Sequence, residues 1–208
     1  GAFDNFQKLE EVVLPEGLKA IKASAFFSCY RLKKINVPTT LRTIGASVFS
    51  EPEFDSFSLK RVKKIGNMCF SGSKIKEVYL SKDCRSSSLV FWGSDDLKKV
   101  TIEKGVKKIS YGMFCDTALK TIDIPGSVFQ IGEDAFADCK KLQKVTLHEG
   151  IKKVGKNAFY NTSLKEITIP STVTELGKNA FRWESTEKSS LKKVVIRSKN
   201  IKKWGTMV

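Results

Sequence analysis

The chain has 208 residues and a net charge of +15, with 37 lysines and arginines against 22 aspartates and glutamates. A hydrophobic content of 41% argues against a chain that is disordered by composition. No apolar run approaches about 18 residues, so we expect no membrane insertion, and the N-terminus lacks the pattern of a signal peptide. The lysine excess favours polyanionic partners, although it equally fits a solvated surface that keeps an elongated protein soluble.

The sequence repeats itself from end to end in units of 21–27 residues. Counted from an opening anchor, apolar residues recur at +3, +5, +9 and +12, and an Ala-Phe pair stands at +16 and +17. A period in the low twenties is typical of leucine-rich-repeat solenoids. We therefore expect one repeat domain over residues 1–208, with about eight full repeats and a partial repeat at each end. The anchors are Leu9, Leu32, Phe54, Ile75, Leu97, Leu119, Leu142, Leu164 and Leu191.

Each unit begins with a predicted strand, because +3 and +5 alternate with polar residues, from Val12 and Leu14 in the first unit to Val194 and Ile196 in the last. The second apolar pair, at +9 and +12, usually precedes a glycine, for which we expect a turn with positive φ. We expect the Ala-Phe pair on a helical turn, with its rings stacked along one core. The phenylalanines concerned are Phe26, Phe49, Phe70, Phe114, Phe136, Phe159 and Phe181.

Three units depart from this pattern. The third lacks one residue before Val62, and the fourth has no glycine and places Phe91-Trp92 where Ala-Phe is expected. The eighth carries about five extra residues, which predicts an exposed loop at 182–190. Insertions between stacked repeats become surface loops, so this segment is the expected irregular feature of the surface.

The ends of the repeats carry a family resemblance. The segments 25–32 (AFFSCYRL) and 135–142 (AFADCKKL) share one pattern of Ala-Phe and Cys-x-x-Leu. This pattern resembles the bacterial surface type of leucine-rich repeat, known from the Bacteroides surface protein A (BspA-like) family and from Treponema-type proteins. The resemblance implies a right-handed, curved solenoid with short strands in a parallel sheet on its concave face. It also implies an extracellular or cell-surface bacterial protein that adheres to a host or matrix protein or a glycan, with no shared catalytic motif.

Position +4 of each strand should point outward on that concave face. Most of this column is small and uncharged, and Tyr79 is its single aromatic residue. Such a groove suits a peptide or a glycan, but the same residues also fit plain β-propensity at exposed strand positions. Trp183 in the 182–190 loop is a further candidate, because large aromatic residues dominate binding hot spots. The binding candidates are Tyr79, Thr101, Asp123, Thr146, Thr168 and Trp183.

Lysine pairs at +10 and +11 recur in alternate units and predict basic ridges along the solenoid, an alternative site for nonspecific polyanion capture. Opposite charges at +2 are expected to pair with each other instead. A specific reader of nucleic acid would show arginine forks and stacking aromatics among its basic residues, whereas this chain prefers lysine. The polyanion candidates are Lys63, Lys64, Lys107, Lys108, Lys152 and Lys153.

Residues that could carry chemistry are few. The single histidine, His148, is expected about one strand away from Asp123, but no serine or cysteine completes a catalytic set. The five cysteines form no C-x-x-C pair, which argues against a disulfide framework and a zinc site. Cys29 and Cys139 share position +20 and are predicted to be reduced residues in a buried apolar slot. We therefore predict no enzyme activity, no cofactor and no metal site.

Overall fold

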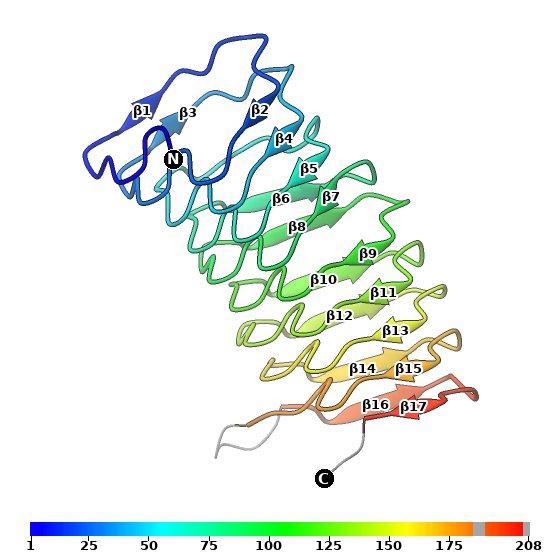
Figure 1. Ribbon diagram of the computed structural model, residues 1–208. Coiled ribbons are helices and arrows are strands. Elements are labelled where there is room, and N and C mark those ends of the chain that lie inside the picture. The colour runs from blue at the N-terminus through cyan, green and yellow to red at the C-terminus, as the bar shows by residue number, and fades with distance from the viewer. Residues whose placement is uncertain (185–189, 206–208) are drawn as a thin grey trace.

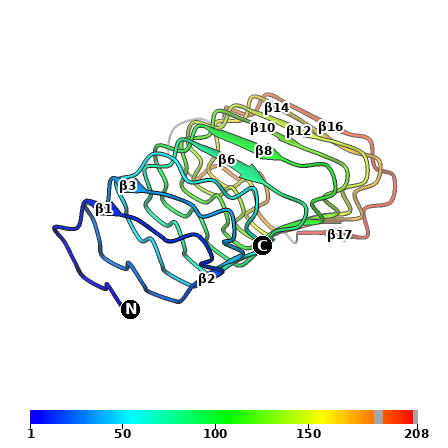
Figure 2. The same ribbon diagram turned by 90° about the horizontal axis from the view of Figure 1, so that it is seen from above.

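The computed structural model, which describes residues 1–184 and 190–205, is a solenoid of stacked parallel coils (Figure 1). The strands β1 and β17 lie at opposite ends of the stack. Each regular coil carries a strand on either side of a thin cross-section, as the view along the stack shows (Figure 2). The predicted leucine-rich-repeat solenoid is confirmed. Among the described residues, no helix has the length and hydropathy needed to cross a membrane.

The strands form two rows, which we call the long-strand face and the short-strand face. The long-strand face, predicted to be concave, carries β1 (Glu11–Val12), β3 (Lys34–Ile35), β6 (Glu77–Leu80), β8 (Lys99–Ile102), β10 (Thr121–Ile124), β12 (Lys144–Leu147), β14 (Glu166–Ile169) and β16 (Lys193–Ile196). The short-strand face carries β2 (Ala20–Ile21), β4 (Thr43–Ile44), β5 (Lys64–Ile65), β7 (Arg85–Ser86), β9 (Lys108–Ile109), β11 (Gln130–Ile131), β13 (Lys153–Val154), β15 (Glu175–Leu176) and β17 (Lys203–Trp204).

All the strand pairs are parallel and join equivalent positions of neighbouring coils. On the long-strand face, β1 pairs with β3, β6 with β8, β10 with β12 and β14 with β16. On the short-strand face the order is β2-β4-β5-β7 and, separately, β9-β11-β13-β15-β17. Because the pairing is in register, residues at one repeat position form a column, with neighbours about 4.8 Å apart.

The strand predicted in the third unit is absent. Phe57 and Leu59 are buried as expected, but residues 54–59 form no strand. This coil is one residue short, and the ring of Phe57 packs against both Phe49 and Phe70, at centroid distances of 5.4 and 5.2 Å. The coil therefore accommodates two large rings, Phe54 and Phe57, beside the spine, while the carbonyl of Asp55 still accepts a hydrogen bond from the N–H of Lys76 at 3.1 Å.

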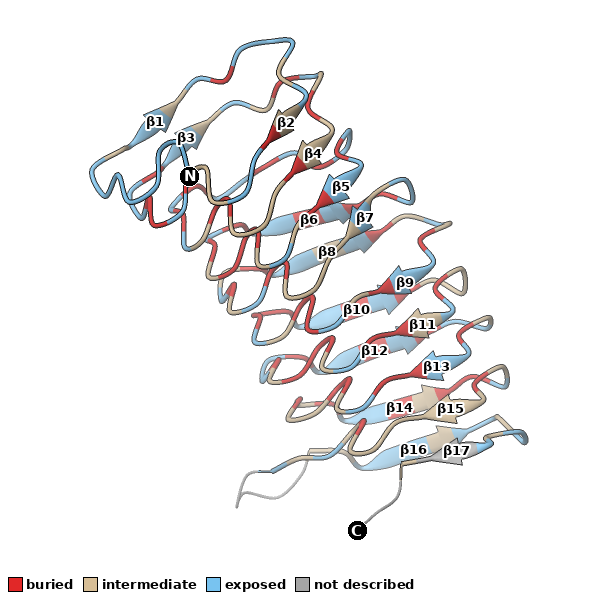
Figure 3. Ribbon diagram, in the orientation of Figure 1, coloured by how far each residue is buried: buried red, intermediate tan, exposed pale blue. Residues whose placement is uncertain are grey.

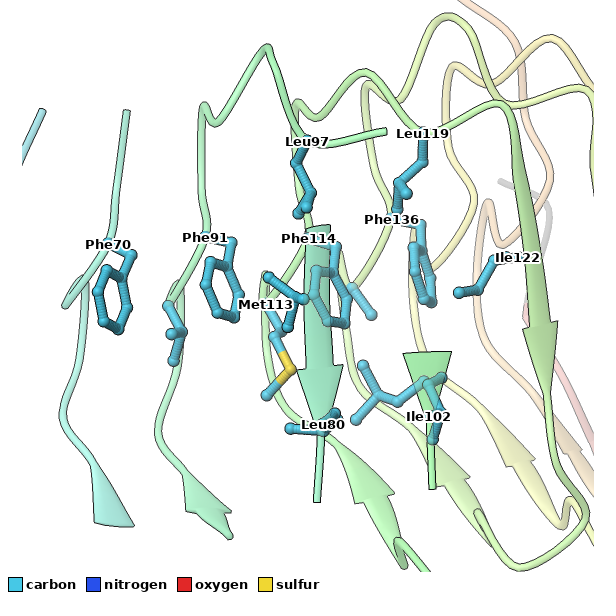
Figure 4. Close-up of a cluster of buried hydrophobic side chains, with 14 of the residues drawn as sticks. Phe70, Leu80, Phe91, Leu97, Ile102, Met113, Phe114, Leu119, Ile122 and Phe136 are labelled. Carbon is cyan, nitrogen blue, oxygen red and sulfur yellow. The ribbon is translucent and has the colours of Figure 1, made fainter. Parts of the chain in front are cut away.

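The aromatic spine predicted from the repeats is confirmed (Figure 4). From Phe3 to Phe181, the rings of neighbouring coils stack with centroids 5.3–5.7 Å apart and interplanar angles of 1–25°. In the fourth coil Phe91 fills the slot alone, so placing Trp92 there as well was wrong. Trp92 lies one residue further and is 44% exposed. Figure 3 shows the buried residues that line the interior of successive coils.

The turn that carries each spine residue is not helical, contrary to the expectation. Residues two positions before the phenylalanine, such as Asp134 and Asn157, have φ near +50°, which ends any right-handed helical run. The backbone N–H groups instead donate to the next coil, as from Phe114 to Ala135 and from Phe136 to Ala158, both at 2.9 Å. The turns therefore form a third hydrogen-bonded ladder along the stack.

The glycines that follow the second apolar pair serve a different purpose from the one predicted. Gly45, Gly66, Gly132, Gly155 and Gly177 do not adopt positive φ. A Cβ atom at any of them would come within 2.3–2.8 Å of the backbone of the preceding coil. The column is glycine because the coils approach too closely there for a side chain.

The cysteine slot is buried, as predicted, but it is not apolar. The Cys139 thiol donates to the carbonyl of Phe114 at 3.0 Å, and the Thr117 hydroxyl donates to the same carbonyl at 3.0 Å. In other coils the position is held by residues such as Ser94, whose hydroxyl donates to the carbonyl of Phe70. All five cysteines are free thiols, and burial raises the pKa of Cys139 to about 11. The slot selects small side chains that donate a hydrogen bond.

The last unit departs from the predicted burial. Val194 and Ile196 occupy the inward positions +3 and +5 but are 50% and 45% exposed. They lie in β16, which pairs with β14 on one side. These two side chains therefore contribute apolar surface at the end of the described stack.

Candidate binding faces

A groove crosses the long-strand face at the third coil, where the strand is missing. It encloses about 580 Å³ and extends from Val37, beside β3, across Ser58 to Tyr79 in β6 and Thr101 in β8. Apolar side chains form part of the lining, and Lys60 adds a charge. The sequence explains the hollow, because a coil without an extended strand leaves a gap in a row of extended ones.

Tyr79 projects into this groove because Val78 and Leu80, its neighbours in β6, are buried. Its ring is 37% exposed, and partial burial together with the adjacent Glu103 carboxylate raises the pKa of Tyr79. The Glu103 carboxylate also accepts a hydrogen bond from the backbone N–H of Lys82 at 3.0 Å, which lowers the pKa of Glu103. The Tyr79 ring thus lies beside a carboxylate of the neighbouring coil and presents aromatic surface to the groove.

The other predicted strand candidates continue the same column without forming a cavity. Thr101 stands beside Tyr79 in the pairing of β6 with β8, and Asp123 stands beside Thr146 in that of β10 with β12. Thr168 in β14 is half-buried. The five predicted residues therefore share one face, but only Tyr79 and Thr101 line the groove.

Two pairs at position +2 of the long-strand face neutralise each other, as predicted. Lys99 lies 3.1 Å from Glu77, and Lys34 lies 4.0 Å from Glu11. Each pair is exposed and contributes about 0–1 kcal/mol to stability, so its effect is mainly on the local potential. These two pairs consequently add little positive charge to the face, whereas Lys144 in β12 forms no ion pair with any described residue.

The side chains of His148 and Asp123 lie within hydrogen-bonding distance, with 2.7 Å between Nε2 and Oδ1. The side chains are 51% and 74% exposed, so water surrounds the pair. The residue beside Asp123 in the strand register is Thr146, and Cys139 is buried in the core, where its thiol donates to the carbonyl of Phe114. Among the described residues, no group of three or more His, Cys, Asp and Glu gathers in a way that could hold a metal ion.

Trp183 is half-buried, and its enclosed indole N–H has no hydrogen-bond partner among residues 1–184 and 190–205. The ring therefore does not simply project into solvent as the insertion suggested. Residues 185–189 of the predicted 182–190 loop lie outside the described residues. The contribution of this segment to binding stays a prediction.

The six predicted polyanion lysines are all exposed, on or beside the short-strand face. Lys64, Lys108 and Lys153 lie in β5, β9 and β13, and the other three precede them. Lys153 pairs with Glu175 at 3.1 Å, whereas the other five form no ion pair with any described residue. The basic ridge at +10 extends over more coils than the three predicted lysine pairs. In chain order, its column reads Lys19, Arg42, Lys63, Cys84, Lys107, Phe129, Lys152, Thr174 and Lys202.

Several exposed aromatic residues lie outside the predicted candidates, and two of them stand out. Phe129 is 48% exposed at +10 of the sixth unit, and Trp92 is 44% exposed after the spine. Aligning the units by position would have revealed Phe129, because its column is otherwise largely basic. Trp92 could not be placed from sequence, since the fourth unit offers two adjacent rings for one slot.

Comparison with known proteins agrees with this architecture. The profile of a family described as "BspA type Leucine rich repeat region" matches six copies over residues 1–117 and 87–188. No functionally curated protein matches the chain.

Solved structures share the fold. A leucine-rich repeat protein from Bacteroides ovatus is 26% identical, with a TM-score of 0.81 over 95% of this chain and 57% of its own. A leucine-rich cell surface protein from Faecalibacterium prausnitzii is 19% identical, with a TM-score of 0.62 over 93% and 82% of the two chains. The T. pallidum leucine-rich repeat protein is 24% identical, with a TM-score of 0.58 over 68% of each. The chain thus spans little more than half the length of the Bacteroides ovatus protein.

Proposed function

Because the chain belongs to the BspA-type leucine-rich repeat family, we propose that it is a noncatalytic binding module of a cell-surface or secreted bacterial protein. Its partner is a host or matrix protein, or a glycan, held by the long-strand face, with the 182–190 segment as a second contact. The leucine-rich-repeat solenoid is typically a scaffold whose outward residues determine the partner. A similar fold occurs in a protein described as a cell surface protein, which supports the location.

The groove at Tyr79 is the observation that carries this proposal. It combines a hollow of about 580 Å³ with a half-exposed aromatic ring whose neighbours in β6, Val78 and Leu80, are buried. A rigid aromatic anchor loses little side-chain entropy on binding, which is one reason why tyrosine is frequent at hot spots. Thr101 and Ser58 add hydroxyl groups that a peptide backbone or a sugar could use.

The direct test is an array of glycans and matrix proteins, followed by titration of any partner found. Tyr79→Ala together with Trp183→Ala should weaken binding at least tenfold, because a hot-spot residue contributes more than about 1.4 kcal/mol. Tyr30→Ala, which removes a tyrosine that is 42% exposed outside the groove, is the matched control. Equal affinities of the double variant and the control would remove Tyr79 and Trp183 from the site.

A second candidate function is electrostatic capture of a polyanion by the short-strand face. It is favoured by the five lysines of the predicted set that form no ion pair within the described residues. Polyanion binding releases counterions, so the affinity must fall steeply as salt rises. An affinity for heparin or for an oligonucleotide that stays constant between about 50 and 200 mM salt would rule this function out.

A further inference from the structure

Phe129 stands between two lysines on the short-strand face. Its backbone N–H donates to the carbonyl of Lys107 at 3.0 Å, and its own carbonyl accepts from the N–H of Lys152 at 2.9 Å. The three residues occupy position +10 of consecutive coils, so the two lysines lie about 10 Å apart with the ring midway. We call Lys107, Phe129 and Lys152 the ridge triad.

The ring of Phe129 is available to a ligand. It is 48% exposed, while Val128 and Ile131 on either side of it in sequence are fully buried and fix the position of β11. A single exposed phenylalanine is ordinary on a protein surface. What distinguishes this one is its setting, because its neighbours along the column are cations and no described aromatic ring packs against it.

The charge around the triad is not neutralised. Lys107, Lys108 and Lys152 form no ion pair with any described residue, in contrast to Lys99 on the opposite face. The same column continues with further cations and contains no acidic residue. These cations are Lys19, Arg42 and Lys63 toward the N-terminus and Lys202 toward the C-terminus. Unpaired cations at one repeat position of successive coils attract a linear polyanion along the solenoid axis.

We propose that this row binds an acidic polysaccharide, with anionic groups of the chain paired to Lys107 and Lys152 and one sugar ring packed by its C–H face on Phe129. The proposal rests on the second candidate function and deepens it, by naming the ligand class and the central residue. The triad alternates charge, apolar ring and charge, which matches a polymer whose sugar rings have apolar faces and carry sulfate or carboxylate groups at their edges.

The aromatic content of the ridge favours a polysaccharide over a single-stranded nucleic acid. Proteins that bind single strands stack successive bases on several aromatic residues. The +10 column offers one ring in nine coils, flanked by lysines rather than by arginines. Lysine presents a point charge, whereas arginine offers the bidentate fork that is over-represented at phosphate sites.

The test uses a heparin-derived octasaccharide and a single-stranded oligo-dT of similar length, each titrated between about 50 and 200 mM salt. Phe129→Ala should weaken octasaccharide binding about tenfold, the order that one stacking contact contributes, without changing the salt slope. The double variant K107Q/K152Q should reduce the slope of log K against log salt by about 1.4–1.8. The matched control K98Q/K120Q removes two exposed lysines from the flank of the long-strand face and should retain both affinity and slope.

Each other outcome overturns the inference in a different way. Loss of affinity in K107Q/K152Q but not in Phe129→Ala would leave polyanion capture standing and refute the aromatic contact. Tighter, Phe129-dependent binding of oligo-dT would refute the ligand class. Equal losses in K107Q/K152Q and in K98Q/K120Q would show that total charge, not the ridge, attracts the ligand. Absence of binding to either probe at low salt would refute the second candidate function as well.

Discussion

Replacing Gly155 by alanine tests whether the glycine column is required by close packing or by backbone conformation. A Cβ atom at this position would lie 2.6 Å from the backbone N of Glu133, whereas ordinary contacts begin at 3.4 Å. The obstacle is backbone, so no side chain can rotate out of the way. The sixth and seventh coils would have to separate locally by about 0.8 Å.

The magnitude follows from the hydrogen bonds that cross this contact. Gly155 donates to the carbonyl of Ile131 at 2.9 Å, and Asp134 donates to the carbonyl of Lys156 at 3.0 Å. Lengthening both by about 0.8 Å would take them beyond hydrogen-bonding distance. Losing both bonds, at about 1–3 kcal/mol for each, costs about 2–6 kcal/mol. We expect urea unfolding, followed by far-UV circular dichroism, to show a loss of that size for Gly155→Ala.

Gly155→Asn separates the two explanations. Asparagine adopts left-handed conformations far more readily than alanine, so it would restore stability if the column needed positive φ. Close packing predicts that asparagine is at least as damaging as alanine. Gly17→Ala is the comparison, because Gly17 has φ +95° and open space around its Cβ position, so its cost of about 1–2 kcal/mol is conformational. A stable Gly155→Asn would refute the packing argument.

Three further predictions concern the core and the titrating groups. Phe136→Ala should destabilise the chain by about 3–5 kcal/mol, whereas Phe181→Ala, at a half-buried ring, should cost about 2 kcal/mol or less in the same urea assay. Hydrogen bonds from the backbone and hydroxyl of Ser171 lower the pKa of Glu149. The ionised Glu149 carboxylate therefore stabilises the fold above the ordinary carboxylate pKa, and this stabilisation is lost as acid protonates it. Glu149→Gln should reduce the decline of thermal stability between about pH 5 and pH 3. Burial raises the pKa of Cys139 to about 11, so mass spectrometry should find it unalkylated by iodoacetamide at neutral pH unless the chain is unfolded.

The repeat spacing predicted the architecture because residues at the same repeat position occupy the same environment in every coil. A position that is apolar in every unit must face the shared core, and the stacked rings of Phe114, Phe136 and Phe159 confirm this. The alternation at +3 and +5 likewise predicted which strand residues are buried, except at the end of the described stack. Periodicity therefore sufficed for the fold and for the column in which Tyr79 lies.

The sequence did not predict the features that depend on contacts between neighbouring coils. A glycine permits both positive φ and close approach, and only the distance from Gly155 to the preceding coil decides between them. The groove exists because residues 54–59 form no strand, although Phe57 and Leu59 keep the apolar pattern of one. Phe129 was overlooked because its importance comes from Lys107 and Lys152, more than twenty residues away in the chain but adjacent in space.

A paired and an unpaired lysine on opposite faces lead to a last prediction. Lys99 is matched by Glu77 at 3.1 Å, while Lys107 has no acidic partner among the described residues. Single variants Lys99→Gln and Lys107→Gln remove the same charge, yet only the second removes an unpaired one. Lys107→Gln should therefore lower the salt slope of octasaccharide binding by about 0.7–0.9, and Lys99→Gln should leave it unchanged. Equal slopes for the two variants would show that the polyanion responds to net charge, because a local pairing of charges would then have no effect on binding.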